Sequence, residues 1–534
     1  MYKSIDYPNL CHRFRSKLLI QKHCGILLES NQQKNMKKNT MLLFVFVTIA
    51  ITGIAQHKGI AYYIENAPFK MEAVKTPNFP DKKFIVTDFG AKPVKNFLNT
   101  KAINDAIVAC TAAGGGTVII PEGQWLTGPI EMKSNVNLYA SKGAEINFTE
   151  DHTQYPMINP GNKGNKFVTK SPIYAYEASN FAITGQGIFD GAGDSWREVK
   201  KSKVDKTTWQ ILQNKGGVLS NDGKVWWPSR EAYAGEEYVK QLKEKSNVTA
   251  DDYLAARDFL RPYMVYFIKC KQVLLEGITF RNSPKFVFYP NNCRDLTMDK
   301  VNVYNDYAAQ NGDGIDISAC KNVVIYNCTV SAGDDGICMK SSGKTETPQS
   351  ANLENIVIAE CTVLKAHGGF VIGSNTDGGM NNIFVSNCTF NGSDIGVRVK
   401  SNSGVGGYVH NIYIQDIYMR NIEQEVFSFT TDYANVTAGK SKKDVLPTEN
   451  NKIPEFTNFY CKNIVCNGAD RAFFLEGLAT QKIHHLYFEN ISITSNKGFE
   501  CKQSEEIFLK NVTIKSEESN PFKTNGCKGI HINE

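Results

Sequence analysis

Several marks of common protein classes are missing from this chain of 534 residues. Its 14 cysteines form no CxxC motif and no cluster with histidine at metal-binding spacing, so a metal site built on these residues is not expected. Net charge is also missing from most of the chain. Residues 1–55 hold eight Lys/Arg and two Asp/Glu, which leaves 52 side chains of each sign in the remainder. A neutral chain gives no electrostatic support for nucleic-acid binding, so no nucleic-acid partner is predicted.

Long apolar runs are scarce as well, and the one exception lies near the N-terminus. A basic stretch beginning at Met36 precedes MLLFVFVTIAITGIAQ, which ends in small residues. This pattern is typical of a secretory signal, and the run is too short for a membrane span. We predict an upstream extension over residues 1–35, a signal peptide over residues 36–55, and an exported protein, periplasmic or secreted, without membrane attachment after cleavage. The alternative is a cytosolic tail before a membrane anchor.

The remainder, residues 56–534, is dominated by a repeat. A short strand of alternating apolar residues returns at intervals of 21 to 33 residues, with one interval near 47. The copies are residues 273–280, 295–303, 322–330, 355–363, 382–390, 411–419, 459–466, 485–493 and 507–514. Alternation, β-branched residues and frequent Asn at the bends are typical of parallel β-coils. We predict an all-β fold, a single-stranded right-handed parallel β-helix of about ten coils.

Residue types that recur at one position of the repeat support this interpretation. Cys328, Cys361 and Cys388 fall at equivalent positions, so they are expected to point inward as small apolar residues rather than to form disulfides. Asn-x-Thr/Ser sequences recur in the same way, and we interpret their asparagines as bend residues rather than as glycosylation sites. These asparagines are Asn327, Asn387, Asn490 and Asn511.

Two segments depart from the repeat. Residues 100–113 carry an apolar helical face before a glycine run, which predicts a short N-terminal capping helix over the open end of the stack. Residues 194–256 form a helical insertion rich in Lys, Glu and Trp. This insertion is either solvated or a wall at one end of a binding groove. In the second case its tryptophans would offer faces for stacking on sugars; they are Trp196, Trp209, Trp226 and Trp227.

Polar residues gather at one phase of four consecutive coils, whose second strands read GIDIS, GICMKS, GFVIGS and GVRVKS. Asp313 directly precedes the first strand, and Asp334 and Asp335 precede the second. Equivalent positions on adjacent coils stack about 4.8 Å apart, so Asp313 and Asp335 should share one column, with Asp334 beside them. His367 precedes the third strand on the next coil.

Alternation in the fourth strand places Arg398 and Lys400 together on the outer face. Three stacked carboxylates repel one another, so at least one should be protonated near neutral pH, which supplies an acid beside a base. The two cations would suit the carboxylate of an acidic sugar. Surface charges or Asp-Gly turns could explain any single residue, but six residues in phase on four consecutive coils favour a site.

These motifs resemble the polygalacturonase family, glycoside hydrolase family 28, over nearly all of residues 56–534. The resemblance begins with FGA, NTKAI and GGGTVIIPEG, and it includes ITGQGIFDGAG and Arg261-Pro262. Its specific motifs are Asn311-Gly312-Asp313, Gly333-Asp334-Asp335, His367-Gly368 and Arg398-Val399-Lys400, with Tyr433 beyond. Gly312 stands where the family often has Thr, and Val399 where it usually has Ile.

The resemblance implies hydrolysis of α-1,4-galacturonan with inversion, without metal or other cofactor. It implies that Asp334 is the general acid, that Asp313 and Asp335 activate water, and that His367 tunes the acid. Residues implied to hold galacturonate are Asn311, Arg398, Lys400 and Tyr433. Family members keep these carboxylates closer together than the usual inverting separation, so their distance alone does not indicate retention.

The predicted partner is a pectic polysaccharide or oligogalacturonide, and a monomer is expected. Exo-action is predicted, because the insertion could close one end of the groove. The alternatives are a rhamnogalacturonan or substituted-galacturonan hydrolase of the same family, a calcium-dependent pectate lyase, and a non-catalytic β-helix that binds polysaccharide.

Overall fold

The computed structural model describes residues 58–161, 164, 166–433 and 452–533, which belong to one compact unit. The predicted extension and signal peptide lie outside the described residues. Within these ranges no helix is long and apolar enough to cross a membrane.

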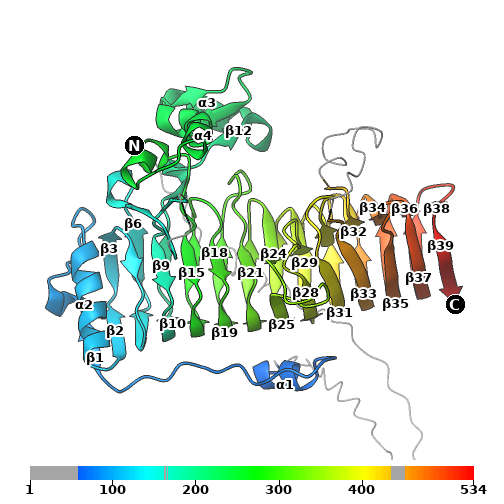
Figure 1. Ribbon diagram of the computed structural model, residues 1–534, viewed down its shortest axis with the longest axis horizontal. Helices are drawn as coiled ribbons and strands as arrows, with labels where there is room; N and C mark the ends of the chain where they lie inside the picture. The colour runs from blue at the N-terminus through cyan, green and yellow to red at the C-terminus, as the bar shows by residue number, and fades with distance from the viewer. Residues whose placement is uncertain (1–57, 162–163, 165, 434–451, 534) are drawn as a thin grey trace, which may run out of the picture. The chain divides into compact units, whose positions relative to one another are not determined.

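Stacked parallel strands build a β-helix (Figure 1). One face is a 12-stranded parallel sheet, here called the site sheet. Its strands are β4 (Ile130–Glu131), β9 (Ile173–Tyr176), β15 (Val265–Ile268), β18 (Phe288–Asn291), β21 (Ile315–Ser318), β24 (Asp335–Lys340), β27 (Gly368–Ile372), β30 (Val397–Lys400), β32 (Glu425–Thr430), β34 (Arg471–Glu476), β36 (Lys497–Lys502) and β38 (Phe522–Asn525). The predicted right-handed parallel β-helix is confirmed, with twelve strands on this face against the ten or so coils expected.

The remaining strands of the coils form a 22-stranded sheet. One set of them is β1 (Lys83–Ile85), β2 (Gly116–Ile120), β5 (Val136–Ala140), β10 (Ser179–Gly185), β16 (Lys271–Glu276), β19 (Arg294–Asp299), β22 (Lys321–Tyr326), β25 (Leu353–Ala359) and β28 (Met380–Ser386). The set beside it is β3 (Gly123–Thr127), β6 (Ala144–Phe148), β11 (Ile188–Asp190), β17 (Thr279–Arg281), β20 (Asn302–Tyr304), β23 (Thr329–Ser331), β26 (Thr362–Lys365) and β29 (Thr389–Asn391). Later coils replace both sets by single long strands, β31 (Tyr408–Arg420), β33 (Glu455–Asn467), β35 (Ile483–Ser495) and β37 (Ser504–Ser516), followed by β39 (Lys528–Asn533).

The repeat positions behave as their residue types predict. Cys328, Cys361 and Cys388 are buried in the core and carry free thiols, as expected. The four asparagines of the Asn-x-Thr/Ser sequences all adopt left-handed backbone with φ between 51° and 55°, a conformation that Asn tolerates better than most residues. Asn511 donates through Nδ2 to Asn490 Oδ1 at 2.8 Å, so such side chains also link successive bends.

The open N-terminal end of the stack is covered by α2 (Thr100–Ala112), which buries Ile103, Ala106, Ile107 and Cys110 against the first strands. This confirms the predicted capping helix. A second helix, α1 (Ile60–Glu65), lies against β25 far along the stack. There Tyr63 donates its hydroxyl hydrogen to Glu360 Oε1 at 2.7 Å.

The insertion rises from the N-terminal half of the stack (Figure 1). Its elements are η3 (Gly193–Ser195), β12 (Val199–Lys200), η4 (Lys201–Lys203), α3 (Lys206–Asn214), β13 (Val218–Leu219), β14 (Val225–Trp227), α4 (Arg230–Lys243) and η5 (Asp251–Ala256). The alternative in which the tryptophans stack on sugars does not hold for Trp196, Trp209 and Trp226, because all three are buried. Trp227 packs near Tyr233 and Phe259, with ring centroids 6.3 and 6.5 Å away. A separate hydrophobic cluster of the insertion buries Leu242, Val248 and Tyr253 together with Met157.

Candidate active site

The register of the site sheet brings the three aspartates together. Ile315 of β21 pairs with Ile337 of β24, so Asp313 and Asp335, each two residues earlier, occupy one column on adjacent strands. Asp335 in turn pairs with Gly368 of β27, which places Asp334 beside His367. One carboxylate oxygen from each of Asp313, Asp334 and Asp335 lies within 4.8 Å of the other two.

Two cations of β30 reach this column. Val397 and Val399 point into the core, so Arg398 and Lys400 stand on the outer face as expected. Lys400 Nζ lies 2.8 Å from Asp335 Oδ2, and Arg398 Nη1 lies 3.8 Å from Asp335 Oδ1. Both cations lie 5.2 Å from the ring centroid of Tyr433, which therefore joins the same cluster.

A third cation was missed in the sequence. Lys340 Nζ is buried 3.3 Å from Asp313 Oδ2 and 3.1 Å from Asp316 Oδ1. It follows Met339, which pairs with Ile372 and through it with Val399, so Lys340 shares a register position with Lys400. The alternation that selects Lys400 in GVRVKS would have selected Lys340 in GICMKS and Asp316 in GIDIS.

The aspartates of the column differ in acidity. Burial, reinforced by neighbouring Asp316, raises the pKa of Asp313 well above its usual range, although Lys340 opposes this. Burial acts in the same direction on Asp335, but Lys400, Lys340 and Arg398 outweigh it and hold the pKa of that carboxyl below its usual range. The surroundings therefore favour the protonated form of Asp313 and the ionised form of Asp335.

His367 is held from both sides. Its Nδ1 lies 3.1 Å from Asp334 Oδ1, and its Nε2 lies 2.8 Å from Nζ of Lys203. An ammonium group only donates hydrogen bonds, so Nε2 accepts from Lys203 and the ring proton resides on Nδ1, directed at Asp334. Lys203 also donates to the carbonyl oxygen of Gly333 at 3.0 Å. No repeat relates η4 of the insertion to the coils, so the sequence carried no signal for this contact.

Asn311 is oriented by Arg261. Its Oδ1 accepts from Arg261 Nη2 at 3.1 Å, and its backbone has φ of 52°. Arg261 also donates to the carbonyl oxygens of Gln310 and Pro284, at 2.8 and 3.2 Å. The buried guanidinium thereby ties two successive turns of the site sheet together.

The glycines before Asp313 and Asp334 are required by close packing. A Cβ atom at Gly312 would lie 2.7 Å from Cβ of Ala309, and one at Gly333 would lie 2.4 Å from the carbonyl oxygen of Ala309. The turn that carries Ala309 therefore leaves no room for a side chain at Gly312 or Gly333.

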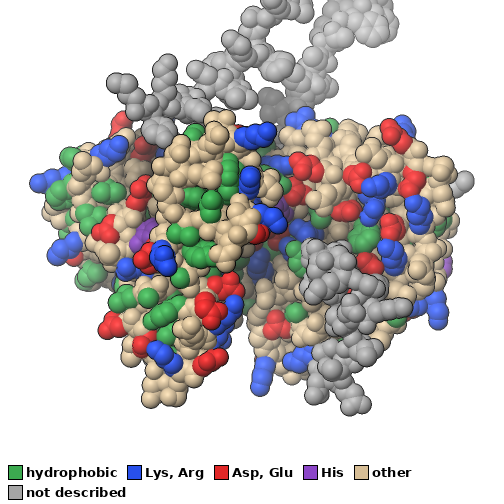
Figure 2. All heavy atoms as spheres, turned by 90° about the horizontal axis from the view of Figure 1, so that it is seen from above, with side chains coloured by type: hydrophobic (Ala, Val, Ile, Leu, Met, Phe, Trp, Pro, Cys, Tyr) green, Lys and Arg blue, Asp and Glu red, His purple; other side chains and the backbone are tan. Residues whose placement is uncertain are grey.

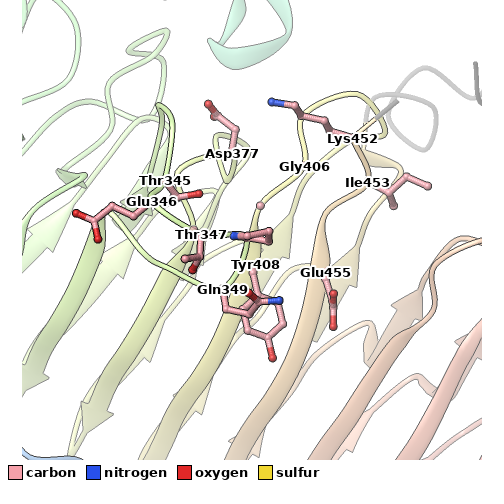
Figure 3. A pocket seen from close by; sticks show the side chains of 13 residues that line it. Thr345, Glu346, Thr347, Gln349, Asp377, Gly406, Tyr408, Lys452, Ile453 and Glu455 are labelled. Carbon is pink, nitrogen blue, oxygen red and sulfur yellow. The ribbon is translucent and has the colours of Figure 1, made fainter. Parts of the chain in front are cut away.

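Seen from above, the surface is hollowed between two raised parts, and Lys and Arg side chains gather along the hollow (Figure 2). On the side of the insertion, a pocket of about 450 Å³ is lined by Lys203, Arg197 and Asp306. A separate pocket of about 500 Å³, lined by Asp377, Tyr408 and Glu455 among others, contains none of the predicted site residues (Figure 3).

Comparisons with known proteins identify the family of this chain. The family model described as glycosyl hydrolases family 28 matches residues 200–508. An exo-poly-α-D-galacturonosidase of Dickeya chrysanthemi is 23% identical over 529 residues, covering 96% of this chain and 82% of that protein. An endo-polygalacturonase of Pectobacterium carotovorum subsp. carotovorum is 25% identical over 401 residues, covering 73% and 81%.

Solved structures show the same fold. An exopolygalacturonase from Thermotoga maritima superposes with a TM-score of 0.63 and 26% identity, covering 86% of this chain and 94% of that one. A family 28 exopolygalacturonase of Yersinia enterocolitica gives a TM-score of 0.66 at 21% identity, covering 85% and 79%. The chain belongs to glycosyl hydrolases family 28 and is a glycoside hydrolase.

Proposed function

We propose that this protein hydrolyses α-1,4-galacturonosyl linkages in pectic polysaccharide or oligogalacturonides, with inversion and without metal. The observation that carries the proposal is the column of three aspartates with Arg398 and Lys400 beside it. An acid and a base side by side cleave a glycosidic bond, and paired cations select an acidic sugar. The relatives named as polygalacturonases support the same substrate.

Exposure supports a division of roles within the column. The side chain of Asp334 is 20% exposed, whereas those of Asp313 and Asp335 are 5% and 3% exposed. The leaving oxygen belongs to a bulky sugar, so Asp334 is the carboxyl group that can reach it and deliver a proton. His367, with its Nδ1 proton directed at Asp334, orients this acid.

Asp313 and Asp335 are placed to activate water. Among the described residues, Oδ1 of each side chain is buried and no hydrogen bond reaches it, so each carboxyl keeps an unsatisfied acceptor beside the other. Asp335, whose pKa is lowered, can take a proton from water, while Asp313, whose raised pKa favours the protonated form, can orient that water by donating a hydrogen bond. Attack of this water on the anomeric carbon, as the leaving oxygen takes the proton of Asp334, completes an inverting hydrolysis.

Galacturonate would be held by Arg398, Lys400, Asn311 and Tyr433. Arg398 is only loosely paired with Asp335, at 3.8 Å, so its planar guanidinium can bind a sugar carboxylate through two parallel hydrogen bonds. The ammonium groups of Lys340 and Lys400 already lie against Asp313 and Asp335. These groups supply the positive charge that a metal ion would otherwise bring, which supports metal-independent chemistry.

Exo-action is part of the proposal. The insertion contributes Lys203 to the site and lines a pocket beside it, so it is positioned to close one end of the groove. Relatives named as exo-acting enzymes favour the same mode. Export through the signal at residues 36–55 and a monomeric state remain further proposals.

Replacing Asp334 by Asn tests the proposed function. Hydrolysis of polygalacturonate should fall by about 10²–10⁴-fold, because Asn cannot donate the proton, while binding of the polymer should persist. Reducing ends and equilibrium binding are measured on the same preparation. Unchanged turnover would sink the assignment, and a wild-type protein that binds without cleaving would be a carbohydrate-binding β-helix instead.

A further inference from the structure

Lys285 lies on the opposite side of the catalytic aspartates from Arg398 and Lys400. It precedes Phe286, which stands two residues before Phe288, and Phe288 pairs with Ile315. Phe286 therefore holds on its coil the position that Asp313 holds on the next. The cations of β30 lie four strands further along the site sheet from β18 in the C-terminal direction.

Among the described residues, Nζ of Lys285 forms no hydrogen bond or ion pair, and its neighbours are aromatic rings. It lies 5.0 Å from the ring centroid of Tyr263 and 5.6 Å from that of Phe286. Arg261 nearby is engaged by carbonyl oxygens, by Asn311 and by Glu198, whose Oε1 lies 3.4 Å away. The negative charges of Asp313, Glu198 and Asp316 favour the ammonium form of Lys285 but do not offset its burial, and an anionic ligand in direct contact would.

The electrostatics agree with an amine that needs a ligand. Burial, with Arg261 adding repulsion, lowers the pKa of Lys285 to about 8. A bound carboxylate would favour the charged form and restore a higher pKa.

An aromatic platform adjoins this amine on the site sheet. Tyr263 lies 5.1 Å from Tyr266 and 4.5 Å from Tyr289 between ring centroids, and Tyr266 stacks on Tyr289 at 5.5 Å. All three rings are partly exposed. Tyrosine rings suit the apolar face of a sugar while leaving a polar edge in water. A cation beside such rings is equipped for a sugar that carries a carboxylate.

We propose that Lys285 binds the carboxylate of a second galacturonate unit, on the other side of the cleaved bond from the unit held by Arg398 and Lys400. This inference rests on the proposed function and deepens it. It assigns the enzyme to backbones with uronates on both sides of the bond. A backbone in which neutral sugars alternate with galacturonate would leave one of the two cationic positions without its carboxylate.

Equilibrium binding of trigalacturonate to the Asp334→Asn protein tests this without interference from turnover. Lys285→Met and Arg398→Met are introduced separately and together into that protein, and Lys271→Met, at an exposed lysine of β16, is the matched control. Lys285→Met and Arg398→Met should each raise the Kd for trigalacturonate about tenfold. Their combination should raise the Kd about a hundredfold, because the effects of losing contacts to two separate carboxylates multiply. Thermal unfolding midpoints check that every variant is folded.

Two other binding results would overturn the inference, and one kinetic result would reject the proposed function instead. If the Kd of the double variant is no higher than the higher Kd of the two single variants, both cations share one carboxylate. A Lys285→Met protein that binds as tightly as the control would exclude the contact. Failure of wild type to cleave trigalacturonate would instead reject the proposed function itself.

The pH dependence of binding gives a second readout. The Kd of the parent protein for trigalacturonate should rise as pH increases through about 8, where the free amine of Lys285 loses its proton. The Lys285→Met protein should lack this change, and its persistence there would count against the assignment.

Discussion

Asp335 is surrounded by three cationic side chains, whereas Asp313 faces Lys340 and has Asp316 beside it. The same residue type on neighbouring strands thereby acquires opposite acidity, which a glycoside hydrolase needs if one carboxyl is to stay ionised beside a protonated one. At the residue scale, the different acidities of Asp313 and Asp335 come from their different neighbours.

Leaving-group dependence separates the roles of the aspartates. On an aryl galacturonide with a good leaving group, the Asp334→Asn protein should lose less than about tenfold in kcat/KM, because the departing group needs no proton. The Asp335→Asn protein should lose about 10²-fold or more on aryl and natural substrates alike, since activation of water is needed for both. Equal losses for the two variants on the aryl substrate would contradict the proposed roles.

Titration of Asp316 should make the free energy of unfolding depend on pH. Burial raises its pKa from the usual 3.8 to about 6, although Lys340 opposes this. The folded protein therefore binds this proton more tightly than the unfolded chain, a stabilisation that is complete below pH 3.8 and is lost as pH rises through about 6. Asn cannot titrate, so the free energy of unfolding of Asp316→Asn relative to wild type should improve by about 1.4 kcal/mol per pH unit across that window.

Denaturant unfolding below and above this window measures the effect, and Asp81→Asn at an exposed position is the control. A difference from wild type that is the same at both pH values would show that Asp316 does not titrate as described.

At the scale of the elements, the insertion contributes a side chain to the site. The short helix η4 carries Lys203 to His367, so the insertion helps fix the imidazole that faces Asp334. The site therefore depends on an element outside the repeat.

Substituting Lys203 by Met should lower kcat by about tenfold or more with little change in KM, because His367 loses the donor that fixes its tautomer while the cations that bind substrate remain. Lys201→Met in the same helix η4 is the matched control, since Lys201 is exposed. An effect on KM alone would indicate that Lys203 contacts substrate instead, and no effect would remove it from the site.

Side-chain positions could be predicted from the sequence only where the chain follows the coil repeat. Alternation placed Arg398 and Lys400 outward and the cysteine column inward, because every coil repeats the same core contacts. Lys340 obeyed the same rule and was overlooked. Lys203 and the buried tryptophans of the insertion could not be placed, since nothing in that segment repeats and burial of its aromatic side chains depends on its own tertiary packing.

At the scale of the whole molecule, the regular strand spacing of the β-helix sets the distances between the side chains of the site. Strands about 4.8 Å apart convert positions in the repeat into distances along a groove. The aspartates therefore sit between two cationic positions, Lys285 before them and Arg398 with Lys400 after them. The family resemblance and the hydrolase class predicted from the motifs are confirmed, whereas the roles of individual residues remain predictions.

The most direct measurement of the central claim is product analysis of polygalacturonate treated with the wild-type protein in the presence of a metal chelator. The account predicts full activity with chelator, saturated products without absorbance near 235 nm, and galacturonate monomer from the outset of the reaction. A ladder of oligomers would reject exo-action while leaving hydrolysis intact. Activity that disappears with chelator, together with unsaturated products, would contradict the hydrolytic carboxylate site itself.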